Sequence, residues 1–183
     1  MSTIVVLSGS PSAVSRTAAL CAHVSDRLRR AGHEVAALRA RDLPARALLA
    51  ADTGHPRIAE AVRLVEEADG VVVASPVYKA AYSGLLKALL DLLPQFAFAG
   101  KVVLPLVTGG SPAHVLAIDY ALRPVLTSLG ADHVVPGWFV LDRHITIDGG
   151  EVALDPEHAA PLHRVVDAFA SAVDARRPLL AAS

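Results

Sequence analysis

The sequence predicts a doubly wound α/β domain, in which helices cover both faces of a parallel sheet. Short runs rich in apolar and β-branched residues alternate with longer runs of helical period. The short runs are apolar throughout, which is typical of strands buried on both faces. We expect five strands at residues 3–7, 34–38, 71–74, 101–107 and 133–140. We expect five helices at residues 16–30, 57–67, 82–93, 113–129 and 156–176, giving a three-layer α/β/α sandwich.

Length and composition indicate one domain over residues 1–183. No apolar run reaches the roughly 18 residues of a membrane span, and residues 1–7 lack the basic start of a signal peptide, so we expect a cytoplasmic protein. The net charge of −1 and the mixed charges argue against nucleic acid as a partner. Residues 177–183 have no periodicity and are expected to form a flexible tail.

Cysteine and histidine usage excludes two kinds of site. The single cysteine, Cys21, cannot form an intramolecular disulfide, and its place in a helical pattern predicts a packed thiol. His158 and His163 are five residues apart, so they do not share a helix face, and we expect no metal site. No segment supplies an obvious catalytic acid, base or nucleophile.

The loop after the first strand combines hydroxyl groups with one arginine at a predicted helix start. It lacks both the Gly-x-Gly-x-x-Gly fingerprint and the lysine of a P-loop. Free amides, the helix dipole and hydroxyls there suit a phosphate monoester such as that of FMN, although simple helix capping explains the same residues equally well. The candidate phosphate ligands are Ser8, Ser10, Ser15, Arg16 and Thr17.

Two further loops follow the third and fourth strands, at the edge where doubly wound sheets bind ligands. In the first, an aromatic residue and small residues could lie against a flat ring, the alternative being an ordinary turn. In the second, consecutive glycines permit close approach of the backbone to a ligand, the alternative being a turn before a helix. The candidate residues are Pro76, Val77, Tyr78, Lys79, Thr108, Gly109, Gly110 and His114.

Two helices carry signals of their own. Pro124 cannot donate a hydrogen bond to the carbonyl of Tyr120, so helix 113–129 should be distorted there, as a proline kink or as a π-bulge. Leucines cover most of the circumference of helix 82–93, which favours burial on two sides. We expect a dimer or tetramer through this helix and helix 113–129, the alternative being a helix buried under loops of the same chain.

Several short motifs occur together in the chain. They are LSGSP at 7–11, SPVYKAAYSG at 75–84, LLDLLP at 89–94, GKVVLP at 100–105, TGG at 108–110, AH at 113–114 and DYAL at 119–122. Together these motifs resemble the NADPH-dependent FMN reductase family from about residue 3 to residue 140, and residues 76–126 resemble its members associated with alkanesulfonate monooxygenases.

The resemblance implies a flavodoxin-like fold and hydride transfer from NADPH, or from NADH, to FMN that comes and goes as a substrate. It also implies an FMNH2-dependent monooxygenase as a partner, in alkanesulfonate desulfonation for sulfur acquisition. The tyrosine matching Tyr120 is the extra residue of a π-helix at the subunit interface of a homotetramer, associated with flavin release. Many members carry arginine where this chain has Ser12, and Arg16 can replace that charge.

Two other functions fit the same fold. One is a reductase that keeps its FMN and acts on quinones, azo compounds or metal oxyanions. The other is a flavodoxin-type electron carrier, although such carriers are usually strongly acidic and this chain carries a net charge of only −1.

Overall fold

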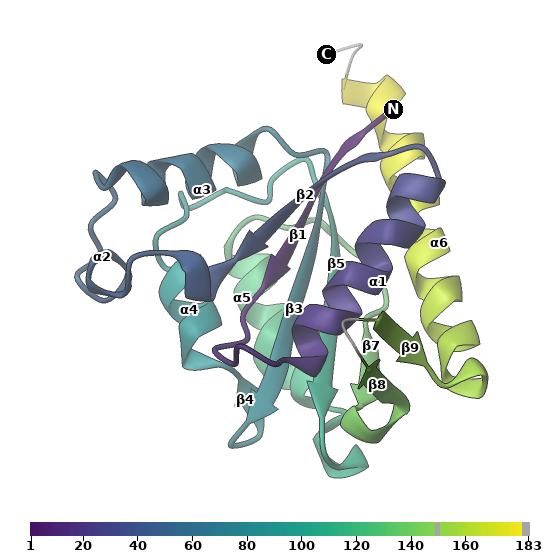
Figure 1. Ribbon diagram of the computed structural model, residues 1–183. Helices are drawn as coiled ribbons and strands as arrows, with labels where there is room; N and C mark the ends of the chain where they lie inside the picture. The colour runs from purple at the N-terminus through teal and green to yellow at the C-terminus, as the bar shows by residue number, and fades with distance from the viewer. Residues whose placement is uncertain (149–150, 181–183) are drawn as a thin grey trace.

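The computed structural model describes residues 1–148 and 151–180, and its centre is a parallel sheet (Figure 1). Neighbouring strands follow the order β2-β1-β3-β5-β6, with β7 pairing beside β5. This order, in which the chain winds outward from β1 in both directions, is that of the flavodoxin-like fold. The strands are β1 (Thr3–Ser8), β2 (Glu34–Arg39), β3 (Gly70–Tyr78), β5 (Val102–Gly109), β6 (His133–Val134) and β7 (Trp138–Leu141).

Helices cover both faces of the sheet, as the sequence predicts (Figure 1). α1 (Arg16–Arg30) and α6 (Pro156–Leu180) cover one face, while α3 (Pro56–Glu66), α4 (Gly84–Leu90) and α5 (Arg123–Ser128) cover the other. β1 shows why both faces need cover. Val5 and Leu7 belong to the core under α3 and α4, whereas Ile4 and Val6 belong to the core under α1 and α6.

The prediction of one strand at 133–140 is wrong, because the chain breaks into β6 and β7 at Pro136-Gly137. A Cβ at Gly137 would lie 2.5 Å from the carbonyl oxygen of Pro105, so only glycine permits this close crossing. Several short elements also have no counterpart in the sequence prediction. They are α2 (Ala45–Leu49), β4 (Ala81–Tyr82), which pairs antiparallel with β3, and the hairpin of β8 (Ile145–Asp148) and β9 (Glu151–Leu154).

The predicted continuous helix 113–129 is divided into a 3₁₀ turn (Pro112–His114), a π-helix (Ile118–Leu122) and α5. The amide of Arg123 donates to the carbonyl of Ile118, five residues earlier, which is the hydrogen bond that defines a π-helix. The expected distortion near Tyr120 is therefore confirmed, and it is a π-helix. Pro124, which has no amide hydrogen, lies in the first turn of α5, where no donor is needed.

The leucines of the predicted helix 82–93 are already buried within the chain. α4 itself spans only Gly84–Leu90, and its Leu86, Leu89 and Leu90 are at most 1% exposed. The chain covers them with its own α2 and the 3₁₀ turn Ala40–Asp42, so they give no reason to expect a second subunit. α6 continues to Leu180, four residues beyond the predicted end, and residues 181–183 of the expected tail lie outside the described residues.

Two buried serine hydroxyls connect the loop after β1, strand β3 and the segment that follows β3. The Ser83 hydroxyl donates to the carbonyl of Gly9 and accepts from the amide of Leu86, so it also caps α4. The Ser75 hydroxyl accepts from the amide of Ser83 at 2.9 Å. These bonds fix the loop after β1 and the segment after β3 as one unit.

A second buried contact joins α1 to the end of β5. The hydroxyls of Thr17 and Thr108 lie 2.7 Å apart, and both residues are buried. All three loops at the carboxyl edge of the sheet are thus held by side-chain hydrogen bonds. Among the described residues, no helix has the length and apolar character needed to cross a membrane.

The thiol of Cys21 should resist modification in the native protein. Burial raises its pKa to about 12, outweighing the hydrogen bond from Ser8, so the reactive thiolate is scarce at pH 8. We expect a maleimide or disulfide reagent to label the folded chain far more slowly than the chain in denaturant. Labelling of both at the same rate would contradict the packed position.

Ser83→Ala should destabilise the fold by about 1–3 kcal/mol, because it leaves the buried Gly9 carbonyl and Leu86 amide without partners. Ser128→Ala is the matched control, since that exposed hydroxyl makes a single hydrogen bond to the Val125 carbonyl and its loss should cost less than about 0.5 kcal/mol. Urea denaturation measures both. Equal effects of the two substitutions would refute the role given to Ser83.

Candidate functional site

A cavity of about 190 Å³ lies where the three loops meet at the carboxyl edge of the sheet. It brings together nine of the thirteen binding residues predicted from the sequence. These nine are Ser10, Ser15, Arg16, Thr17, Pro76, Val77, Tyr78, Thr108 and Gly109. Ser12, Val14 and Asp142 complete the lining.

The start of α1 gives one end of this cavity the character of an anion site. Ser15 is the N-cap residue, and its hydroxyl accepts from the amide of Ala18 at 3.1 Å. The amides of Arg16 and Thr17 precede the helical hydrogen-bond ladder, and the first turn holds no acidic residue. Arg16 is exposed, and no carboxylate of the described residues lies within ion-pair distance of it. A phosphate monoester fits these donors.

The turn after β3 forms a second wall of the cavity. Tyr78 is 49% exposed, so its ring is accessible to a planar ligand. Lys79 and Ala80 connect β3 to β4 with φ values of 52° and 66°, a left-handed conformation that costs non-glycine residues roughly 1–2 kcal/mol each. Pairing of Tyr78 with Ala81 across the hairpin holds the turn in place.

The two glycines after β5 differ in their surroundings. A Cβ at Gly109 would lie 3.0 Å from the ring of Phe139, so packing against that ring explains this glycine. A Cβ at Gly110 would meet nothing within 4 Å, which leaves the backbone of Gly110 open to a ligand. Gly110 itself does not line the 190 Å³ cavity.

The remaining predicted residues also lie outside that cavity. Ser8 is buried and its hydroxyl contacts the thiol of Cys21 beneath α1. Lys79 is exposed at the hairpin turn. His114 lines a second cavity, of about 370 Å³, together with Ala80, Leu116 and Tyr120. The structure therefore places nine of the candidates in the 190 Å³ cavity and His114 in the 370 Å³ cavity, whereas Ser8, Lys79 and Gly110 line neither of these two.

Asp142 is a cavity residue that the sequence analysis did not single out. It begins the 3₁₀ turn Asp142–His144 after β7, at the carboxyl edge of the sheet. The same rule that pointed to the other loops applies to this one, because ligands of doubly wound folds bind at strand ends. Its carboxylate suits the hydroxyl groups of a polyol chain better than a phosphate.

The residues present therefore fit FMN. Amides, hydroxyls and one arginine suit its phosphate, a carboxylate suits its ribityl hydroxyls, and an exposed aromatic ring beside open backbone suits its flat ring.

Comparison with known proteins agrees with this chemistry. An FMN reductase (NADPH) of Pseudomonas putida is 44% identical over 177 residues, which cover 96% of this chain and 89% of that protein. An NADH-dependent FMN reductase, SfnF, of Pseudomonas putida is 36% identical over 73% of each chain. A solved NADH:FMN oxidoreductase in its apo form superposes with a TM-score of 0.86 at 44% identity, covering 94% of this chain and 90% of that one.

Residues 2–146, which contain every predicted binding residue, match the family of NADPH-dependent FMN reductases. The chain belongs to this family and is an oxidoreductase that acts on FMN with a reduced nicotinamide nucleotide as the electron donor.

Proposed function

We propose that the protein reduces FMN with NADPH or NADH and then releases the reduced FMN to a separate monooxygenase, as in alkanesulfonate desulfonation. The observation that carries this proposal is the openness of the site: the phosphate-type cavity is small, and both Arg16 and Tyr78 on its walls are exposed. A flavin on such a surface can leave after reduction. A prosthetic group would favour a deeper enclosure.

In this proposal Arg16 and the amides at the start of α1 bind the phosphate, with the Ser10 hydroxyl on the same loop as a further donor. The Ser12 hydroxyl also lines the cavity but already donates to the carbonyl of Val14 at 2.6 Å. The Thr17 and Thr108 hydroxyls satisfy one another and keep one hydrogen for the ligand. Bound FMN supplies the acceptor for a hydride. The chain needs only to hold the two planar rings about 3–3.5 Å apart and to exclude water.

In this proposal the flavin ring lies along the turn at 78–80 and extends from the 190 Å³ cavity towards the 370 Å³ cavity. Tyr78 lines the 190 Å³ cavity and Ala80 lines the 370 Å³ cavity, so the two cavities lie on either side of this turn. The open backbone at Gly110 and the imidazole of His114 would then meet the pyrimidine edge of the ring.

The π-helix supports a proposal about assembly and release. Val115 and Leu116, just before the π-helix, and Tyr120 within it are large exposed apolar residues, and Tyr120 is 80% exposed. Burial of such a patch against a second copy of the chain would stabilise a dimer or tetramer. The resemblance associates the matching tyrosine with flavin release, so we assign to Tyr120 the role of a gate.

Arg16→Ala should raise the KM for FMN about ten-fold or more with little change in kcat, because it removes a charge-assisted contact to the phosphate and nothing at the reacting ring. Arg46→Ala is the matched control, since Arg46 is an exposed arginine on α2 that does not line the cavity. Steady-state NADPH oxidation at varied free FMN measures both variants.

The same assay tests flavin as a substrate. Saturable oxidation that requires added FMN supports the proposal. Purification of a yellow protein that oxidises NADPH only with a quinone or an azo compound would replace it with the bound-flavin reductase. Failure to oxidise NADPH with any acceptor would favour the electron carrier.

Tyr120→Ala should shift the protein towards smaller oligomers, because it removes the most exposed aromatic ring of the apolar patch. Analytical ultracentrifugation measures the change. Phe96→Ala is the control, since Phe96 is also exposed but lies beside Gly130, at the end of α5 opposite to the π-helix. An unchanged oligomer in Tyr120→Ala, or a monomeric wild-type protein, would remove the patch from the interface.

A further inference from the structure

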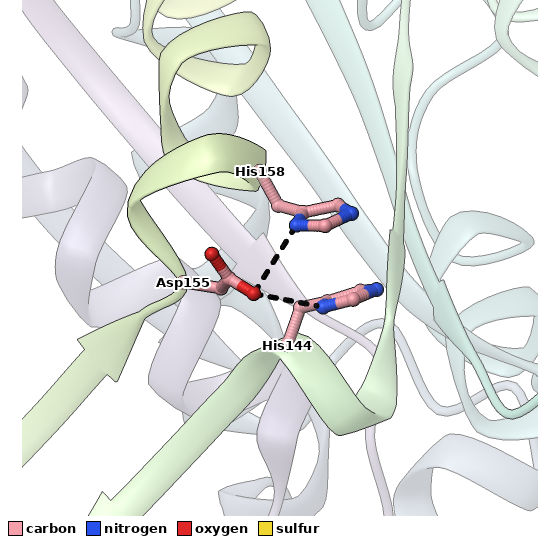
Figure 2. Close-up of side chains that lie close together, drawn as sticks. All are labelled: His144, Asp155 and His158. Atoms are coloured by element: carbon pink, nitrogen blue, oxygen red, sulfur yellow. Dashed lines mark ion pairs between the residues drawn. The ribbon is translucent and has the colours of Figure 1, made fainter.

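We propose that His144, Asp155 and His158 bind a divalent transition-metal ion of the zinc class. The three side chains lie together where the 3₁₀ turn Asp142–His144 meets the start of α6, and Figure 2 shows both imidazole rings with a nitrogen towards the same carboxylate oxygen. No metal site is predicted from the sequence, because His158 and His163 do not share a face of their helix and His144 lies outside that helix.

The distances in the cluster match those of a metal site. Oδ2 of Asp155 lies 3.4 Å from Nδ1 of His144 and 3.4 Å from Nδ1 of His158, and one ligand atom from each residue lies within 4.8 Å of the other two. Around an ion bound at 2.0–2.1 Å, tetrahedral ligands are separated by about 3.3–3.4 Å. Two of the ligand-to-ligand distances that a tetrahedral site requires are therefore present.

The backbone holds the three residues in place. The amide of Asp155 donates to the carbonyl of His144 at 3.0 Å, and the amide of His158 donates to the carbonyl of Asp155 at 2.9 Å. Oδ1 of Asp155 accepts from the amide of Glu157 at 3.1 Å. The cap of α6 thus occupies one carboxylate oxygen and leaves Oδ2 free for a ligand.

One imidazole must turn for both to bind. The rings are stacked with centroids 3.4 Å apart and planes 14° apart, so their Nδ1 lone pairs lie in nearly parallel planes, whereas a shared ion needs them to converge. His158 is the ring that can turn, because its side chain is 44% exposed, while that of His144 is 12% exposed. Nδ1 of His158 is buried without a hydrogen-bond partner among the described residues, and coordination would satisfy it.

The donor set selects the class of ion. Two imidazole nitrogens and one carboxylate oxygen suit zinc, cobalt, nickel or copper, whereas magnesium and calcium prefer oxygen ligands alone. Three protein ligands leave a fourth position for water. The ion would tie α6 to the 3₁₀ turn that begins with Asp142, a wall residue of the 190 Å³ cavity.

The chain contains a second histidine pair that lacks the features of a site. Nε2 of His23 and Nε2 of His163 lie 2.9 Å apart, so these rings satisfy one another. The nearby carboxylate of Asp167 is bound by Arg27 through two hydrogen bonds of 2.7 and 2.6 Å. This pair therefore serves as an internal control for non-specific binding of metal to histidine.

The test is calorimetric titration of the full chain with Zn²⁺ after removal of metal by a chelator. We expect one ion per chain, and we expect affinity to fall more than about ten-fold in Asp155→Asn and in His158→Gln. Asparagine still caps a helix, so Asp155→Asn separates the lost ligand from the lost cap. His163→Gln should bind Zn²⁺ as the wild-type chain does.

Melting temperatures measured with chelator show whether each variant folds, and His158→Gln carries the test should Asp155→Asn not fold. Zn²⁺ should raise the melting temperature of the wild-type chain and of His163→Gln, but not of the two ligand variants. No heat of binding in the wild-type chain, or loss of binding in His163→Gln with retention in His158→Gln, would overturn the site. These outcomes are independent of flavin reduction.

Discussion

The hydrogen bonds of the Ser83 hydroxyl are the contact on which the position of the candidate flavin site depends. This one group binds the carbonyl of Gly9 in the loop after β1 and the amide of Leu86 in the first turn of α4. The amide of Gly9 in turn donates to the carbonyl of Ala74 on β3, and a Cβ at Gly9 would lie 2.5 Å from the Cβ of Leu86. The loop can approach α4 so closely only because residue 9 is glycine. The phosphate end of the site is thereby attached to the third strand as well as to the first.

Long periodic elements could be predicted from the sequence, and short ones could not. α1 begins and ends at the predicted residues, because fifteen residues of clear period are followed by a change of pattern. The break between β6 and β7 depends on the approach of the Pro105 carbonyl to Gly137, which is remote in the chain. The leucines after Ser83 are a second example, because the sequence of a helix that is apolar on several sides does not indicate whether its own chain or another subunit covers it.

The residues of the candidate site could be predicted from the sequence more completely than the short elements of the fold. The reason is that one topological rule brings three separate loops to the same edge of the sheet. Arg16, Tyr78 and Thr108 meet for that reason. Ser8 belongs to the same motif, but its hydroxyl contacts Cys21 beneath α1, and alternation along a strand cannot tell which neighbour a side chain meets. The cluster around Asp155 could not be predicted from the sequence, because His144 lies eleven residues earlier and the β8–β9 hairpin brings it beside Asp155.

Two irregular backbone segments lie beside the candidate flavin site, and both line the 370 Å³ cavity. The left-handed turn at Lys79-Ala80 supplies Ala80, and the π-helix supplies Tyr120, to the same 370 Å³ space. Each segment is less stable than a regular alternative, so each persists only because its surroundings fix it: the β3–β4 pairing for the turn, and α5 for the π-helix. Strained backbone clusters at active sites and ligand-binding sites. The irregular backbone beside Tyr120 thus supports the proposed role of this residue in flavin release, in addition to the side-chain motif.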